Sequence, residues 1–197
     1  MNHLFIKEQS KKITNENRLF LLMLMLLILL IAIAGSVSFG LGFLVALILM
    51  GGLYNSLRDV ILENRTLSFE NTFFTFFIDI KHGLKIMFVN LLYFLMLILG
   101  LALLIVPGIL VALRFSQALR IIVDNKDLDV LGAFRESEKL MNGYKKDLFK
   151  FNLSFFWHFL LGIITCGIYF IYFIPYYYVC LTNYYLHLIQ APITLVV

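Results

Sequence analysis

Residues 105–125 read IVPGILVALRFSQALRIIVDN, and the interpretation of the whole chain starts from this stretch. An apolar run is interrupted by Pro107 and Gly108, resumes, and carries Arg114 and Arg120 before any loop-like composition appears. Proline and glycine inside an apolar run mark a turn between helices. Arginines inside such a run indicate a membrane protein with a polar site, because ionisable residues within a span seldom face lipid.

The composition supports a membrane protein. The chain has 197 residues, of which 61% are hydrophobic and 14% are charged, and its mean hydropathy is +0.92. A soluble domain is typically ~45–50% apolar and ~25% charged, so a soluble fold of this length could not bury the excess. The net charge of +4 could suggest nucleic acid as a partner. In a membrane protein it is better explained by basic cytoplasmic loops, so we expect no nucleic-acid partner.

Hydrophobic stretches of membrane-spanning length recur along the chain. A spanning helix needs ~20 mostly apolar residues. Such stretches predict an all-α, polytopic transmembrane helical bundle with about six spans and two amphipathic helices on the cytoplasmic side. The predicted spans cover residues 19–35, 39–57, 86–106, 108–123, 148–165 and 168–188. Glycine or proline marks the short turns, at Gly35 and Gly40, at Pro107 and Gly108, and at Gly167.

The charged residues predict the orientation of the chain. Lysine and arginine precede the first span and fill the segments between spans two and three and between spans four and five. The three other turns contain no Lys, Arg, Asp or Glu. Since cytoplasmic loops are enriched in Lys and Arg, we expect both termini in the cytoplasm. A cleaved secretory signal ending near the AIAGS sequence is an alternative for the first span, and it would leave the other spans oriented as before.

Two cytoplasmic segments have the pattern of amphipathic helices lying at the membrane surface. Residues 66–85 and 128–147 place apolar side chains at helical spacing with charges between them, and each ends in glycine plus a basic residue, at Gly83 and Gly143. We expect a single integral membrane domain over residues 1–197. Its predicted parts are a cytoplasmic segment 1–18, a hairpin 19–57, and two units of interfacial helix plus hairpin, 66–123 and 128–188. The likeness of these two units leaves open an internal repeat or chance similarity of apolar sequence.

The intramembrane polar residues define a candidate site. Arg114 lies about 9 Å deeper than Gly108 at the helical rise per residue, which places it near mid-bilayer. Its face also carries Gln117, and no Asp or Glu lies within a predicted span, so we expect Arg114 to lack an ionic partner. Polar groups of His158 and Asn183 could reach it, and these four residues form the candidate intramembrane polar site. It is either a structural clasp or a site for an anion or a lipid.

Other residues have simpler interpretations. We expect Arg120, Lys145 and Lys146 to be interfacial basic residues whose side chains extend toward lipid phosphates. Asn90 is a further candidate neighbour for Arg114. Residues 169–185, YFIYFIPYYYVCLTNYY, leave open a tyrosine-lined cavity or aromatic packing around a helix kinked at proline.

Catalytic and metal-binding motifs are not found in the sequence. There is no Walker motif, no HExxH and no GxSxG, and no pair of carboxylates lies in a predicted span. The cysteines, Cys166 and Cys180, lie far from any CxxC spacing and are interpreted as small hydrophobic residues. We therefore expect no metal, no cofactor and no enzymatic activity.

Residues 69–188 contain an ordered series of motifs that resembles a known family. The series consists of Pro107, Gly108, Arg114, Ser116, Asp124, Asn125, Ala133, Ser137, Met141, Gly143, Lys145, Leu148, Phe149, Leu153, Ser154, Phe155, Trp157, Gly162, Gly167, Pro175 and Tyr176. In this order and spacing the chain resembles the multi-pass membrane proteins of low-GC Gram-positive bacteria called domain of unknown function nine-seven-five. Tyr144 departs from the Asn or His that is frequent there. Fainter similarities are to YciC-like proteins and to the membrane domain of glycerophosphodiester phosphodiesterases.

The resemblance implies a six-helix protein of the bacterial cytoplasmic membrane and no agreed activity. Three functional hypotheses follow. The first is a membrane accessory or protective component, associated with an exporter or of the immunity or stress type, with a second membrane protein as partner. The second is a small transporter or lipid-handling protein that uses the intramembrane arginine. The third is a membrane enzyme, which would need Arg114, His158 and Asn183 within contact distance. Membrane lipids are the expected partners in every case.

Overall fold

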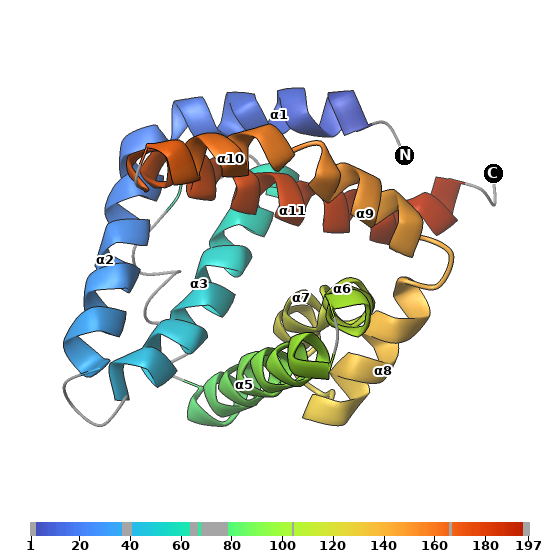
Figure 1. Cartoon of the computed structure of the whole chain (residues 1–197). Coiled ribbons are helices and arrows are strands. Elements are labelled where there is room, and N and C mark those ends of the chain that lie inside the picture. The colour runs from blue at the N-terminus through green and yellow to red at the C-terminus, as the bar shows by residue number, and fades with distance from the viewer. Residues whose placement is uncertain are drawn as a thin grey trace. The chain divides into compact units, whose positions relative to one another are not determined.

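The computed structural model of this chain is built from helices (Figure 1). It describes residues 3–36, 41–63, 67, 79–103, 105–165 and 167–194. No strand occurs among these residues, so the predicted all-α class is confirmed. Two compact units are formed, each from separate parts of the chain. Residues 1–28, 57–67 and 146–197 make up the first unit, and residues 29–56 and 68–145 make up the second.

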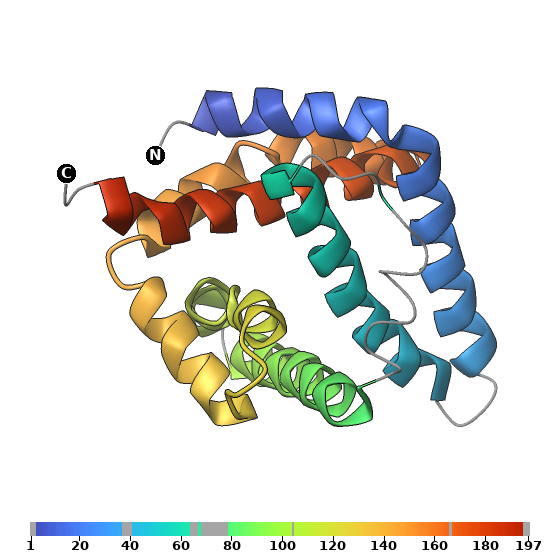
Figure 2. The same cartoon turned by 180° about the vertical axis from the view of Figure 1, so that it is seen from behind.

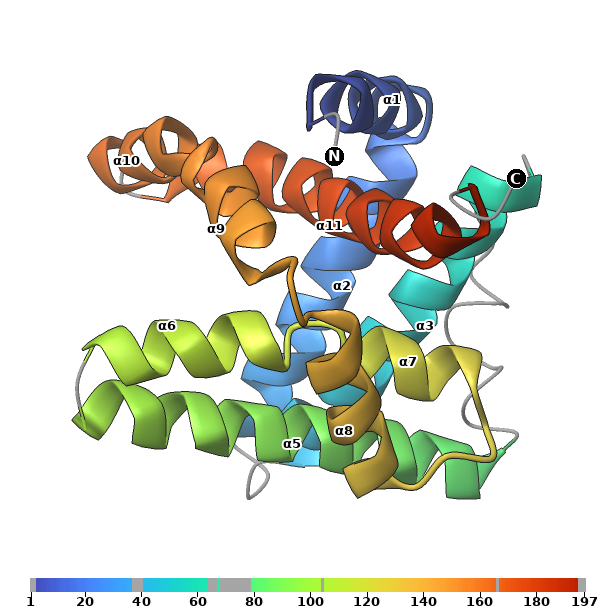
Figure 3. The same ribbon diagram turned by 90° about the vertical axis from the view of Figure 1, so that its right-hand side faces the viewer.

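The first unit joins the two ends of the chain. It contains α1 (His3–Glu16), α9 (Lys145–Leu153) from residue 146 onward, α10 (Phe156–Ile164) and α11 (Ile168–Thr194), with parts of α2 (Arg18–Ser36) and α3 (Leu41–Glu63). Helices α1 and α11 pack together (Figures 1 and 2), and Figure 3 shows that they cross, because α1 is seen end-on there and α11 lengthwise. The helix α1 forms because Ile6, Ser10 and Ile13 recur on one face, which is buried. From the sequence, residues 1–18 are predicted as a cytoplasmic segment, without this packing.

The second unit contains a helical hairpin crossed by shorter helices. Its helices are α5 (Ile80–Leu103), α6 (Ile105–Arg114), α7 (Ala118–Asp124) and α8 (Val130–Leu140), with the remaining parts of α2 and α3. Figure 3 shows α5 and α6 side by side. They approach closely at two glycines, because a Cβ on Gly100 would lie 3.0 Å from the Cα of Gly108. Small residues permit such close helix packing in membranes.

Fewer helices have membrane-spanning character than the sequence predicted. Among the described residues three segments are long and apolar enough to cross a membrane, Leu44–Glu63, Ile80–Gly100 and Lys145–Ile164. A fourth is obtained only if α1 and residues 18–31, which are bent by 84°, count as one broken span. The prediction of about six such spans is therefore not matched. The spans expected at 39–57, 86–106 and 148–165 correspond to the three candidates.

Two of the other predicted spans are not among the candidate spans of the structure, and the reason can be identified for each. The span expected at 108–123 is not one helix, because α6 ends at Arg114 and α7 begins at Ala118. The span expected at 168–188 is one helix, α11, but it is not among the candidates. Its many tyrosines and Asn183 make it less apolar than a typical span.

The two segments predicted to be amphipathic helices compare differently with the structure. Helix α8 lies within residues 128–147, and Gly143 adopts φ 86° after it, a left-handed conformation that ends helices and favours glycine. The other segment, 66–85, falls largely outside the described residues. Its last part belongs to α5, so Gly83 lies inside a helix and does not end one as expected. Gly167 has φ 91°, as suits the turn predicted there.

Large apolar side chains are exposed on many described helices. Examples with more than half of their surface exposed are Leu19, Leu30, Leu99, Trp157, Ile163 and Ile168. Water would make so many exposed apolar groups costly, whereas lipid tails would solvate them. The exposed surface therefore agrees with the membrane as the solvent of this protein.

Candidate functional site

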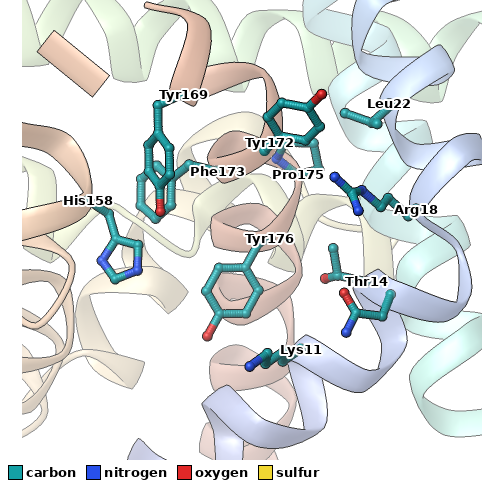
Figure 4. A pocket seen from close by; sticks show the side chains of 11 residues that line it. Lys11, Thr14, Arg18, Leu22, His158, Tyr169, Tyr172, Phe173, Pro175 and Tyr176 are labelled. Carbon is teal, nitrogen blue, oxygen red and sulfur yellow. The ribbon is translucent and has the colours of Figure 1, made fainter. Parts of the chain in front are cut away.

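A pocket of about 410 Å³ lies within the first unit, where α1, α2, α10 and α11 meet (Figure 4). Its lining residues are Lys11, Thr14, Asn15, Arg18, Leu22, His158, Tyr169, Tyr172, Phe173, Pro175 and Tyr176. One side is basic and polar, and the other is aromatic. Figure 4 shows Lys11, Thr14 and Arg18 on the side of α1 and α2, facing the rings of α11.

The bend between α1 and α2 positions the basic side chains. The axes of the two helices differ by 84°, and Asn17 stands between them. Both the backbone N–H and the side-chain amide of Asn17 donate to the carbonyl of Ile13, at 3.1 Å each. The carbonyl of Asn17 in turn accepts from Leu21 N–H at 3.0 Å. The bend thus keeps its backbone groups bonded and brings Lys11 and Arg18 to one pocket from two helices.

The pocket is electropositive. Lys11 and Arg18 contribute two cations, and no acidic residue is among the lining side chains. Within the described part of the chain, neither cation forms an ion pair with a carboxylate. The Arg18 guanidinium lies 4.9 Å from the ring centroid of Tyr172, a cation–π contact. Close by, the Lys7 ammonium lies 4.3 Å from the centroid of the Phe155 ring. Several cations without carboxylates favour the binding of an anion.

The aromatic wall is a cluster of three rings in mutual contact. His158 stacks on Phe173 with ring centroids 5.2 Å apart, and Tyr169 stacks on Phe173 at 6.1 Å. The Nδ1 atom of His158 is buried and has no hydrogen-bond partner among the described residues. An unpaired buried polar atom is energetically costly and is an exception that calls for a partner. This pocket realises the tyrosine-lined cavity that the sequence left open beside simple aromatic packing.

Asn183 is part of the contact between α1 and α11. It is 1% exposed, and its side-chain amide donates to the Ile6 carbonyl at 3.4 Å, to Gln9 Oε1 at 3.1 Å and to Ser10 Oγ at 3.3 Å. These bonds satisfy the amide without any ligand. Of the predicted polar site, the first unit therefore contains His158 at the pocket and Asn183 in a helix contact with other partners.

Arg114 and Gln117 belong to the second unit, at the break between α6 and α7. Arg114 pairs with Glu138 of α8, and both side chains are partly exposed. The expectation that Arg114 lacks an ionic partner is therefore wrong. The reason is that Glu138 lies outside every predicted span, so a search restricted to spans could not find it. Asn90, another expected neighbour, instead donates to the carbonyl of Leu47 at 3.0 Å.

Gln117 lies in a buried polar network. It is 1% exposed, its side-chain amide donates to Ser116 Oγ at 2.9 Å, and its oxygen accepts from Arg120 Nη1 at 3.2 Å. Its backbone N–H donates to Ser137 Oγ at 3.3 Å, and Ser137 donates to the Arg114 carbonyl at 3.1 Å. The network connects the backbone of the break to α8. It satisfies the polar groups that the end of a helix leaves unpaired.

The predicted interfacial basic residues do not share one environment. Arg120 is 5% exposed, donates to the Ser116 carbonyl at 3.1 Å and lies over the Tyr54 ring at 5.9 Å. It is enclosed by protein, so the expectation that it reaches toward lipid phosphates is wrong. Lys145 and Lys146, at the start of α9, are half-buried and exposed respectively, and their interfacial role stays a prediction.

The basic side of the pocket is not predicted from the sequence. Lys11 and Arg18 were counted only as charges preceding the first span. The recurrence of Ile6, Ser10 and Ile13 could have identified α1 as a helix. Its packing against a helix from the other end of the chain could not be read from one sequence. Among the described residues, no group of His, Cys, Asp and Glu side chains could hold a metal ion.

The all-helical structure and its membrane-length helices define the class, a helical protein with several helices able to span a membrane. The chain belongs to the family described as protein of unknown function (DUF975), whose model matches residues 14–192. The resemblance seen in the sequence is thereby confirmed. No curated protein and no solved structure matches the chain. The similarities to YciC-like proteins and to phosphodiesterase membrane domains stay predictions.

Proposed function

We propose that this is a non-enzymatic integral membrane protein that binds an anionic lipid in the pocket of the first unit. The observation that carries the proposal is the pairing of Lys11 and Arg18 at one pocket without an acidic lining residue. A lipid phosphate supplies the missing negative charge. The proposal keeps the lipid-handling hypothesis of the sequence and transfers its site from Arg114, which is neutralised by Glu138, to the pocket.

The walls of the pocket suit an amphiphile better than an inorganic ion. Leu22, Phe173 and Pro175 line it together with the cations, so apolar and charged groups are adjacent. A phospholipid presents the same combination, a charged headgroup next to an apolar body. Tyrosine, whose ring is apolar and whose hydroxyl is polar, is suited to the boundary between them.

The orientation of the chain is part of the proposal. We place the protein in a bacterial cytoplasmic membrane as a multi-pass protein, with both termini in the cytoplasm. The support is the segregation of all charged loops to one side. This orientation brings Lys11 and Arg18, which precede the first crossing, to the inner leaflet. Basic residues there are attracted to anionic lipid.

The test compares lipids retained by variants that differ only in the position of the lost charge. The tagged protein is extracted gently from its own membrane and analysed by native mass spectrometry. Wild type and the control Lys12→Ala/Lys150→Ala, whose lysines are exposed and do not line the pocket, should retain a stoichiometric anionic lipid. The variant Lys11→Ala/Arg18→Ala should lose it. Equal retention by all three proteins would overturn the proposal.

The same measurement addresses the accessory or protective role. If that role is correct, a stoichiometric second protein should accompany the chain. The lipids should then be the same in the pocket variant and its control, because the contact would lie elsewhere. That result would replace the lipid-handling proposal with the first hypothesis from the sequence.

A further inference from the structure

We infer that the pocket selects a phosphodiester lipid whose headgroup ends in uncharged hydroxyls, as in phosphatidylglycerol. The inference rests on the proposed lipid-binding function and names the class of ligand. It depends on the side of the pocket opposite the cations, where hydrogen-bonding groups are available. The phosphate contacts Lys11 and Arg18, and the headgroup hydroxyls extend toward His158 and the tyrosines.

His158 is the first group that calls for a hydroxyl. The ring lines the pocket and stacks on Phe173 with an angle of 27° between the planes. Its Nδ1 is enclosed by protein, so the nitrogen open to the pocket is Nε2, which forms no hydrogen bond with the described residues. A hydroxyl can donate to this nitrogen or accept from it, so either tautomer of the imidazole is satisfied. A methyl or methylene group in the same place would leave the nitrogen unpaired.

Two tyrosines offer further hydrogen bonds. The phenolic oxygens of Tyr169 and Tyr172, both pocket-lining residues, form no hydrogen bond with any part of the chain that the structure describes. Tyr176, by contrast, donates to the Lys7 carbonyl at 3.5 Å. A headgroup with two adjacent hydroxyls can therefore bond to more than one of these groups. An alkyl headgroup of similar size can bond to none.

The charges of the pocket disfavour headgroups that carry an ammonium ion. No carboxylate lines the pocket to pair with such a group. The aromatic face of Tyr172, which could otherwise attract a cation, already carries Arg18 at 4.9 Å. An ammonium ion would also be repelled by Lys11. Phosphatidylethanolamine and phosphatidylcholine are therefore expected to bind more weakly than an anionic lipid of equal chain length.

The experiment uses lipids that differ in one feature at a time. Purified full-length protein is delipidated and titrated in detergent with dioleoyl phosphatidylglycerol, phosphatidylethanol and phosphatidylethanolamine, and binding is followed by native mass spectrometry. Phosphatidylethanol has the same phosphodiester charge as phosphatidylglycerol and no hydroxyl. Wild type should bind phosphatidylglycerol about fivefold more tightly than phosphatidylethanol, the size expected of one net hydrogen bond.

Variants assign this selectivity to the pocket. His158→Phe keeps a ring for stacking on Phe173 and removes the nitrogen, so it should abolish the preference for phosphatidylglycerol over phosphatidylethanol. Tyr169→Phe removes a single oxygen and should reduce the preference for phosphatidylglycerol over phosphatidylethanol. It replaces His158→Phe as the test if that variant does not fold. Lys11→Ala/Arg18→Ala should weaken both anionic lipids equally and leave the ratio unchanged.

The outcomes separate the failure of this inference from the failure of the proposed function. Equal affinity for phosphatidylglycerol and phosphatidylethanol, with both weakened in Lys11→Ala/Arg18→Ala, would overturn the hydroxyl selectivity and leave lipid binding intact. Affinities that do not respond to the loss of the two cations would overturn the lipid site itself. Glycerol 1-phosphate, titrated by calorimetry, distinguishes a soluble ligand from a lipid. Binding as tight as that of phosphatidylglycerol would overturn the lipid assignment.

Discussion

Arg114 and Arg120 illustrate how one residue type takes two roles within a short segment. The sequence predicts that Arg114 is the buried and unpartnered cation and that Arg120 lies at the headgroups. In the structure Arg114 is partly exposed and paired with Glu138, whereas Arg120 is 5% exposed and bonded to Gln117 and Ser116. The rise per residue gives the depth of a residue along an ideal helix, but it does not predict the break between α6 and α7.

A prediction at the scale of residues follows from this difference. Arg120→Met should destabilise the protein by about 1–3 kcal/mol, because the buried oxygen of Gln117 loses a charged donor. Arg114→Gln should change stability by less than about 1 kcal/mol, because partly exposed ion pairs contribute little. Thermal unfolding in detergent, followed by tryptophan fluorescence, measures both. A larger loss for Arg114→Gln than for Arg120→Met would contradict the assignment of the buried role to Arg120.

At the scale of elements, the spacing of residues along the sequence correctly predicted those features that depend only on sequence neighbours. The amphipathic spacing in residues 128–147 correctly predicted α8, and Gly143 correctly predicted its end, because both signals depend on neighbours in sequence. The apolar runs likewise predicted α5 and the helices of residues 145–164. The break near Phe115 and the burial of α1 were missed. Both depend on partners from distant segments, and periodicity carries no information about which faces will meet.

For the candidate site as well, the sequence predicted which residues are polar but not which distant residues come together. The sequence identified His158 and the tyrosines of residues 169–185 as polar groups in an apolar setting, and the pocket contains several of them. It grouped His158 with Arg114, Gln117 and Asn183 because all lie in apolar stretches. The first unit contains two of these residues and the second unit the other two. The basic half of the pocket required the bend between α1 and α2, which a single sequence does not reveal.

A prediction at the scale of elements concerns the attachment of α1. Asn183→Leu removes the amide that bonds to the Ile6 carbonyl, Gln9 and Ser10. Backbone amides in α1 should then exchange with solvent deuterium faster, by about tenfold if roughly 1–1.5 kcal/mol of local stability is lost. Hydrogen-exchange mass spectrometry measures this, with α8 as the internal control. Unchanged exchange in α1 would show that Asn183 does not hold it.

At the scale of the whole molecule, the segregation of charge is the feature that predicts orientation. Every Lys- or Arg-containing loop lies on one side of the predicted crossings. The helices alone do not define a direction across the membrane. The orientation therefore needs its own measurement, and the chain offers a suitable exposed position in a basic loop.

Accessibility of single cysteines provides that measurement. In a background with Cys166→Ser and Cys180→Ser, a single cysteine introduced at an exposed position is treated with a membrane-impermeant maleimide on intact and on permeabilised cells. Lys126→Cys, whose side chain is exposed, should react only after permeabilisation. The reason is that basic loops remain in the cytoplasm. Labelling of Lys126→Cys on intact cells would reverse the proposed orientation.

The packing of α1 against α11 has a consequence for how the protein is made. Asn183 bonds to a residue 177 positions earlier in the chain, and His3 to one 144 positions later. At a synthesis rate of about 5–20 residues per second, α1 leaves the ribosome roughly ten seconds or more before its partner. During that interval the face that carries Ile6 and Ile13 has no protein to cover it. A premature stop codon upstream of α11 would therefore remove the support of the first helix as well as the last, and quality-control proteases could recognise such a fragment at its N-terminal end.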